Sequence, residues 1–177
     1  MNIKCDLNEK VAREGNLWLK LSEVKSILIA IDPGTNLLGY SLFDIKTKEL
    51  LYSHLITFNK KHTLHRKLTL LYRHLKNLIK DNHITWLAIE NVYFTHRNAI
   101  PLLAAIYEIK ELAKRQKLKL YLVNVRSARK YYNLKGDDIK EVVSKFITKK
   151  FNLTSGFGHD IIDSILIGIY VLDKQGE

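Results

Sequence analysis

Apolar and polar residues alternate in short runs early in the chain. Strand-like segments are predicted at 27–32, 37–44 and 49–57, with Asn36 and the polar stretch 46–48 at the turns between them. Strands joined by turns this short usually pair with each other in antiparallel fashion. The pattern therefore predicts a three-stranded antiparallel meander.

Leucines recur at helical spacing after the third predicted strand, and basic residues occupy the positions between them. This period predicts an amphipathic helix at about 63–81. Further apolar runs then alternate with helical patterns, which is typical of an α/β fold with a mixed sheet flanked by helices. The remaining predicted elements are a strand at 85–90, a helix at 98–116, a strand at 119–124, and helices at 137–150 and 159–173.

Length and composition fit one globular domain. The chain has 177 residues, of which 46% are apolar, and we place the domain at 26–177. Residues 1–25 mix charges and are too few to bury a core, so we expect an N-terminal extension. The longest aliphatic stretch, 165–172, is too short to span a membrane. The single cysteine, Cys5, and the lack of a secretion signal favour an intracellular protein, cytoplasmic or in the host cytoplasm if of phage origin.

The net charge of +11 and the pI of about 9.6 favour a polyanionic partner. A soluble basic surface without such a partner would give the same charge. Cationic residues gather between positions 110 and 150, where we expect a loop after the last strand to offer cations to phosphates and tyrosine rings to bases. The candidate DNA-binding residues of this loop are Arg126, Arg129, Lys130 and Lys135, beside Tyr131 and Tyr132.

Four acidic residues stand where an apolar segment begins or ends. Asp32 closes the first predicted strand and Glu90 the fourth, so each lies where the chain leaves the core. Asp160 and Asp163 open the last predicted helix, and a spacing of three places them on one helical face. Taken singly, Asp32 is typical of a turn and Asp160 of a helix cap.

Together the four acids predict a metal site. Mg²⁺ prefers hard oxygen ligands, and carboxylates from several elements supply them. Two ions roughly 4 Å apart activate water and stabilise the leaving oxygen when a phosphodiester is hydrolysed. An acid at the end of a buried strand is costly unless a cation meets it, which favours this interpretation over four separate turns and caps. We therefore expect a two-metal nuclease that uses Mg²⁺, with Mn²⁺ as a substitute.

Three motifs resemble the RuvC family of Holliday junction resolvases. The first is Ile31–Thr35, continued by Gly39 and Tyr40, and the second is Ile89–Tyr93. The third is the pair of aspartates before the aliphatic C-terminal helix. The motifs follow the family's order and spacing, and the resemblance implies an RNase H-like fold.

The resemblance also implies which residues bind metal and take part in catalysis. The four family acids fall on Asp32, Glu90, Asp160 and Asp163. Some relatives carry histidine in place of the first helical acid, which makes His159 an alternative third ligand. Asp160 is preferred because it keeps the family's three-residue spacing to Asp163.

Further residues receive roles from the same resemblance. Arg129 and Lys140 fall near positions where the family keeps basic residues beside the scissile phosphate, so Lys140 joins the expected catalytic set. Tyr93 matches an aromatic residue that stacks on unpaired bases at the junction centre, and packing under the loop is the alternative. Phe94 and Arg97 belong to the same expected DNA-binding segment.

A four-way junction is two-fold symmetric, so paired nicks favour a homodimer. The helix at 98–116 is the candidate interface because its apolar residues exceed what a one-sided helix requires. Burial of that surplus against the sheet is the alternative. The residues concerned are Ile100, Leu103, Ala104, Tyr107 and Leu112.

The function expected from these observations is a structure-selective endonuclease that resolves Holliday junctions in DNA recombination and repair, with no membrane partner. One alternative is another RNase H-like nuclease of the YqgF type that acts on RNA. The other is a junction-binding protein without catalysis, which the intact set of acids disfavours because acids repel phosphates.

Overall fold

The computed structural model describes residues 26–91, 100–153 and 157–176. At its centre lies a five-stranded mixed sheet in the order β3-β2-β1-β4-β5. The first three strands pair in antiparallel fashion, and β1 pairs with β4 and β4 with β5 in parallel. The predicted meander and mixed sheet are confirmed. The strands are β1 (Ile27–Asp32), β2 (Leu37–Asp44), β3 (Leu50–Thr57), β4 (Ile84–Glu90) and β5 (Lys119–Val123).

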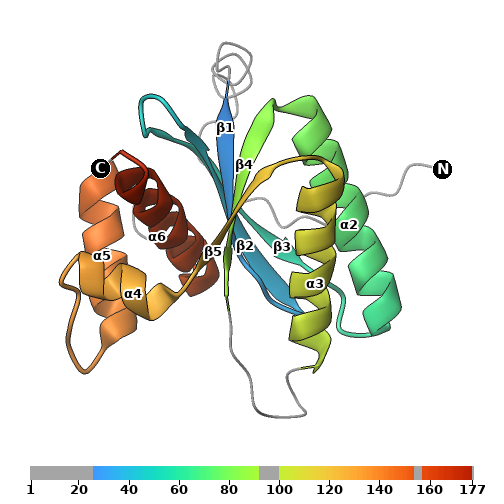
Figure 1. Cartoon of the computed structure of the whole chain (residues 1–177). Coiled ribbons are helices and arrows are strands. Elements are labelled where there is room, and N and C mark those ends of the chain that lie inside the picture. The colour runs from blue at the N-terminus through green and yellow to red at the C-terminus, as the bar shows by residue number, and fades with distance from the viewer. Residues whose placement is uncertain (1–25, 92–99, 154–156, 177) are drawn as a thin grey trace.

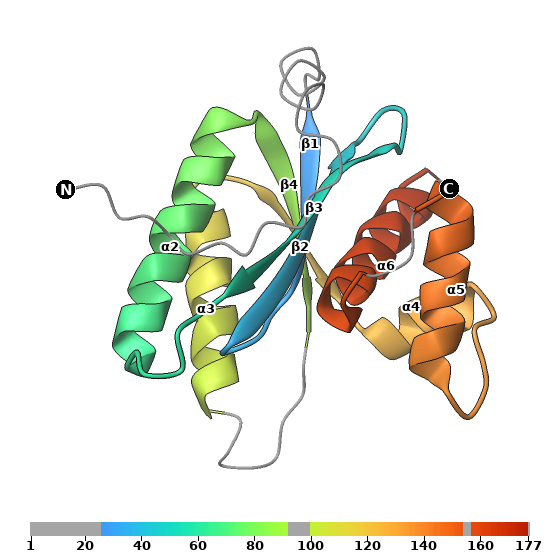
Figure 2. The ribbon, with the colours of Figure 1, turned by 180° about the vertical axis from the view of Figure 1, so that it is seen from behind.

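Helices cover both faces of the sheet (Figure 1). Two of them, α2 and α3, lie on one face, and α4, α5 and α6 lie on the other, as the view from behind also shows (Figure 2). No helix in the described residues is long and apolar enough to cross a membrane. The helices are α2 (Leu64–Asp81), α3 (Ile100–Arg115), α4 (Val125–Tyr131), α5 (Ile139–Phe151) and α6 (His159–Lys174).

Strand β1 supplies side chains to two separate cores. Ile27, Ile29 and Ile31 pack on the side of α2 and α3, whereas Leu28 and Ala30 pack on the side of α6. Side chains of a strand alternate between its faces, so a strand that is covered on both faces is apolar at every position. The same alternation sends the next residue of the strand, an aspartate, toward the layer of α6.

Helix α4 occupies part of the segment that the sequence analysis predicts to be a loop, so that prediction is wrong for Arg126, Arg129 and Lys130. The Asn124 side chain accepts hydrogen bonds from the backbone N–H groups of Arg126 and Ser127, which caps the helix. The helix has only seven residues. A helix this short shows too few apolar repeats to be recognised by periodicity.

Helix α6 packs along β2 in a matched register. Two residues of a strand advance about 6.6 Å and four residues of a helix advance about 6 Å, so contacts recur on both elements together. One contact is the buried hydrogen bond between the hydroxyls of Ser41 and Ser164, 2.6 Å long. The other two are close approaches at glycine, where a Cβ atom would overlap the facing residue. The three contacts join Gly39 to Asp160, Ser41 to Ser164 and Gly168 to Phe43.

Candidate active site

The carboxylates of Asp32 and Glu90 meet at one edge of the sheet. Strands β1 and β4 are parallel neighbours, and Ile31 lies opposite Ile89 in their register. The next residue of each strand is therefore an acid at the same edge, and both side chains face the layer of α6. A side-chain hydrogen bond joins the two carboxyl groups.

Helix α6 brings Asp160 and Asp163 to the same place. Gly39 is the register partner of Asp32 in the antiparallel pair of β1 and β2, and its missing side chain lets the first turn of α6 approach closely. The Ser164 hydroxyl holds this turn by donating to the Ile161 carbonyl, 2.7 Å away, while it pairs with β2. The first turn of α6 therefore lies next to the end of β1, where Asp32 is located.

Burial and mutual repulsion determine the charge state of Asp32. Burial, as the largest cause, and the charges of Asp163, Glu90 and Asp160 together raise its pKa to about 9. The other three predicted acids therefore lie close enough to Asp32 to influence its charge. Without a cation, Asp32 binds a proton at neutral pH, and its hydrogen bond with Glu90 shares that proton.

The environment of Glu90 combines opposing influences. Burial raises the pKa of Glu90, the hydrogen bond with Asp32 lowers it, and the charge of Asp163 raises it again. The guanidinium of Arg129 also lowers the pKa of Glu90. The net direction is upward, which means that the site favours bound positive charge or bound protons over bare carboxylates.

Arg129 is a cation in direct contact with this cluster. Its Nη2 donates to Asp163 Oδ1 at 3.3 Å, and the two side chains are 22% and 20% exposed. The Nε–H of Arg129 is buried and has no acceptor in the described part of the chain. A buried N–H without an acceptor costs free energy unless another group supplies one, and a phosphate oxygen has that chemistry.

The donor set fits a hard divalent cation. Four carboxylates from two strands and a helix supply only oxygen ligands, which suit Mg²⁺ or Mn²⁺, and their repulsion falls when a cation is bound. In the described residues, no three His, Cys, Asp or Glu side chains are already arranged around one point as ligands. The carboxyls of Asp32 and Glu90 hydrogen-bond to each other, and Asp163 pairs with Arg129, so metal binding requires these side chains to turn.

The other predicted site residues are exposed or lie outside the described residues. Lys140 is exposed in the first turn of α5 and forms no hydrogen bond or ion pair with the acids among the residues described. Arg126, Lys130 and Lys135 are exposed on or after α4, and His159 is exposed at the start of α6. Tyr93, Phe94 and Arg97 lie outside the described residues.

The residues that place the acids were not predicted from the sequence. Gly39 is part of a predicted motif, and a glycine inside a strand is a known signal for close approach of another backbone. The Ser41–Ser164 hydrogen bond joins residues 123 positions apart, and no local pattern reveals it. These contacts depend on which helix packs on which strand.

The surface of α3 answers the question that the sequence left open. Ile100 is 61% exposed, Leu103 41% and Tyr107 63%, whereas Leu112 is fully buried in the core. The large apolar residues in the first half of α3 are therefore partly exposed, whereas Leu112 in the second half is buried.

Known structures share this fold. Two structures of Thermus thermophilus RuvC, one of them in complex with a Holliday junction substrate, each match with a TM-score of 0.72 over 85% of this chain and 96% of their own. The sequence identity is 14% for the complex and 15% for the other structure. The fowlpox virus Holliday junction resolvase matches with a TM-score of 0.51 and 16% identity, over 84% of this chain and 99% of its own. The RNase H-like fold that the resemblance implied is confirmed.

Sequence comparison gives two results. The search of curated proteins found no match. The family model for the crossover junction endodeoxyribonuclease RuvC matches residues 28–170, which is most of the chain and contains all four acids. This chain therefore belongs to the RuvC family of crossover junction endodeoxyribonucleases.

Proposed function

We propose that this protein resolves four-way DNA junctions, and that Asp32, Glu90, Asp160 and Asp163 bind the divalent metal ions for hydrolysis. The observation that carries the proposal is the convergence of the four acids, seen in the raised pKa of Asp32 and its causes. A carboxylate cluster that binds protons in the absence of metal is destabilising by itself. A site that binds cations and then phosphate accounts for it.

Each part of the site has a distinct task. Two metal ions, held by Asp32, Glu90, Asp160 and Asp163, would supply activation of a water molecule and stabilisation of the leaving oxygen of the phosphodiester. The acids of β1 and β4 fix the site to the rigid sheet, and Asp160 and Asp163 close it from α6. Arg129 donates its buried N–H to a phosphate oxygen and balances charge that develops during cleavage.

The surface around the site supplies cations for DNA. Arg126, Lys130 and Lys135 are exposed on or after α4, the helix that also carries Arg129, and we assign them to phosphate contacts. Lys140 lies nearby in the sequence on α5, and we retain it as a candidate for the scissile phosphate. Tyr93, with Phe94 and Arg97, remains the proposed stacking segment.

We also propose a homodimer formed through the first half of α3. Ile100, Leu103 and Tyr107 follow each other at intervals of three and four residues, so they form one exposed apolar face. Large apolar faces of this kind mark interfaces. Two active sites related by a two-fold axis suit two symmetry-related strands of a junction.

The test of the function is a gel assay with a synthetic four-way DNA junction, with and without Mg²⁺, beside a stem-loop RNA. We expect paired nicks in the DNA only, and only with Mg²⁺. The Asp32→Asn protein should lose cleavage and bind the junction as well as or better than wild type, because repulsion of phosphate falls. Asp44→Asn is the control, since asparagine keeps the acceptor oxygen that caps the 44–47 turn.

The other possible results of this gel assay distinguish the alternative functions. Near-normal cleavage by Asp32→Asn contradicts the metal site. Cleavage of the RNA alone supports the YqgF-type alternative, and Mg²⁺-independent binding without nicks identifies a junction-binding protein.

The test of the dimer is the molar mass of Leu103→Glu by light scattering. A charge in the proposed interface should yield monomers and remove paired nicking while leaving single nicks. Leu37→Glu is the matched control, because Leu37 is exposed to nearly the same extent, 42%, on β2. Equal masses for the two variants contradict the proposed interface.

A further inference from the structure

The stretch from Leu50 to Lys80 contains no aspartate or glutamate, although the whole chain has 18 of them. It contains seven lysines and arginines. Of these, Lys67 is half-buried and the other six are exposed, and none of the seven forms an ion pair in the described part of the chain. The six exposed cations, which we call the α2 basic surface, are Lys60, Lys61, Arg66, Arg73, Lys76 and Lys80.

Four of these residues form a continuous line on α2. At 100° per residue, Arg66, Arg73, Lys76 and Lys80 fall within about 80° of helix surface and extend for about 21 Å. The opposite side of the helix packs Leu71, Leu75 and Ile79 into the core. The line therefore faces outward along the whole helix.

This surface begins at the catalytic edge of the sheet. Strand β3 runs parallel to β1, two strands away, so its end at Thr57 lies about 10 Å from the end of β1. The loop after Asp32 is tied to it directly. The Phe58 N–H donates to the Asn36 carbonyl at 2.8 Å, and Lys67 Nζ donates to Asn36 Oδ1 at 2.7 Å.

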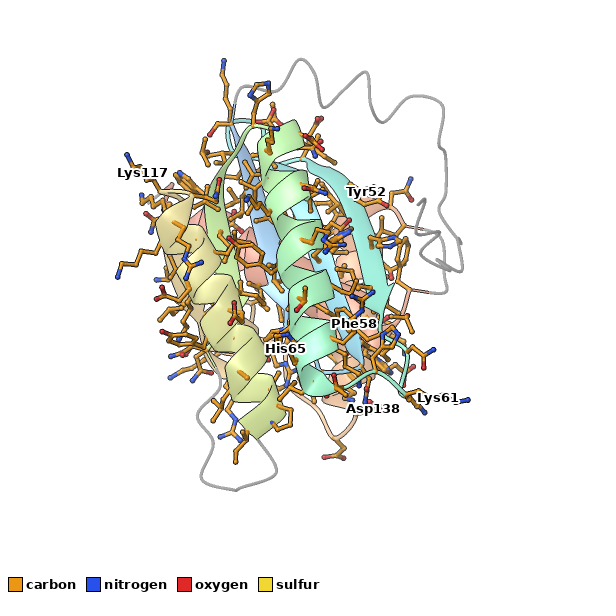
Figure 3. All side chains as sticks on the ribbon, turned by 90° about the vertical axis from the view of Figure 1, so that its right-hand side faces the viewer. Tyr52, Phe58, Lys61, His65, Lys117 and Asp138 are labelled. Atoms are coloured by element: carbon orange, nitrogen blue, oxygen red, sulfur yellow. The ribbon has the colours of Figure 1, made fainter. Side chains whose placement is uncertain are left out.

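Figure 3 shows the direction of α2. Phe58, Lys61 and His65 lie near one end of this helical layer, and Lys117 lies near the opposite end. The α2 basic surface thus starts at the edge of the sheet where β1 and β4 end and leads away from that edge. It lies in the helical layer opposite to α4, which carries the cations already assigned to DNA.

A solvated helix face usually mixes charges of both signs, as α5 does. There Lys145 Nζ lies 2.7 Å from Glu141 Oε1, one turn earlier. Among the residues that the structure describes, the α2 basic surface has no such partners, and like charges along a helix repel one another. A polyanion with regularly spaced charges relieves this repulsion, and its phosphates match an extended line of cations.

We propose that the α2 basic surface binds the phosphate backbone of one duplex arm of the branched DNA substrate. This inference rests on the proposed function, and it adds a second DNA-binding surface on the other side of the sheet from α4. Arms of a four-way junction leave the crossover in different directions, so separate surfaces contact separate arms. The contacts carry no base specificity, because lysines and arginines on this face meet phosphates.

The experiment measures junction binding by fluorescence anisotropy over a range of salt, without divalent metal. The variant is Arg66→Gln/Arg73→Gln/Lys76→Gln, which keeps helix propensity. We expect the slope of log affinity against log salt to become shallower by about 2 to 3, and affinity to fall at least about tenfold at physiological salt. Hydroxyl-radical footprinting should lose protection in one arm within about 10 base pairs of the crossover.

Two further proteins make the test specific. Lys114→Gln/Arg115→Gln/Lys117→Gln removes the same number of cations at the opposite end of the helical layer, and we expect a slope near that of wild type. Lys60→Gln/Lys61→Gln changes the turn before α2 and should weaken protection next to the crossover. Single-turnover cleavage at saturating DNA should be unchanged in the Lys114→Gln/Arg115→Gln/Lys117→Gln control.

The outcomes separate this inference from the function on which it rests. If wild type cleaves junctions and the α2 variant keeps the wild-type slope and footprint, the α2 basic surface does not bind DNA. Equal losses of salt slope and footprint in the Lys114→Gln/Arg115→Gln/Lys117→Gln control also overturn the inference, because they show a general effect of charge. If the α2 variant differs from wild type only in its binding to anionic lipid vesicles, the α2 basic surface recognises a membrane. If wild type neither binds nor cleaves a junction, the proposed function itself fails.

Discussion

The backbone of Gly39 lies directly against the carbonyl oxygen of Asp160, so closely that a Cβ atom at Gly39 would overlap that oxygen. Gly39 is also the register partner of Asp32. One position in β2 therefore fixes the distance between an acid of the sheet and an acid of the helix. The absence of a side chain there is a requirement of the site.

Replacing Gly39 by alanine should displace the start of α6 and reduce cleavage by about 100-fold, the loss expected when catalytic groups are misplaced by about 1 Å. The Mg²⁺ concentration for half-maximal cleavage should rise. Gly158→Ala is the matched control, because nothing lies within 4 Å of a Cβ at the N-cap of α6. Full activity of Gly39→Ala, measured by single-turnover junction cleavage, would show that the contact does not set the site.

The far end of the same helix offers a test by compensation. A Cβ at Gly168 would overlap the ring of Phe43, so Gly168→Ala should lower the free energy of unfolding by about 1 to 3 kcal/mol. Phe43→Leu removes part of the ring, and the double variant should be more stable than the sum of the two single changes predicts. Urea denaturation of all four proteins measures this coupling. Additive effects would mean that the two residues do not constrain each other.

The pKa of Asp32 makes metal-free stability depend on pH. It rises from an ordinary value of 3.8 to about 9 in the folded protein. Between these values the folded state binds a proton that the unfolded state has lost, so wild-type stability falls as pH increases through this window. Asp32→Asn lacks this dependence. Its melting temperature in EDTA should exceed that of wild type most near pH 9 and least near pH 4.

The size of the melting-temperature difference between Asp32→Asn and wild type depends on the length of the chain. Each kcal/mol corresponds to about 2–4 °C in a chain of this size. Adding Mg²⁺ should narrow the difference, because the metal ion stabilises the wild-type carboxylate. A difference that stays constant from pH 4 to pH 9 would contradict the raised pKa.

Arg129 and Arg126 lie on the same short helix and should behave differently. Arg129→Gln removes the guanidinium beside Asp163 and should slow single-turnover cleavage by about 100-fold, with a smaller loss of junction affinity. Arg126→Gln removes an exposed cation and should weaken binding while leaving the rate at saturation unchanged. An unchanged rate at saturation for Arg129→Gln, with weaker junction binding, would assign Arg129 to DNA binding alone.

Local patterns in the sequence predict the strands, the longer helices and the positions of the four acids. Strand β1 is apolar at every position because both of its faces are covered, and an acid after such a run marks the place where the chain leaves the core. The Asp160 and Asp163 spacing is a local property of one helix. These features are encoded within a few residues of each other, so periodicity and motif order were enough to predict them.

The tertiary structure alone decided how the acids meet and which surfaces remain open. Docking of Gly39, Ser41 and Phe43 against α6 joins segments more than 100 residues apart, and no local pattern fixes such contacts. The seven-residue α4 was missed because its cap, Asn124, is a single side chain after a strand. Exposure of Leu103 and burial of Leu112 on one apolar helix likewise depend on where the sheet ends beneath it.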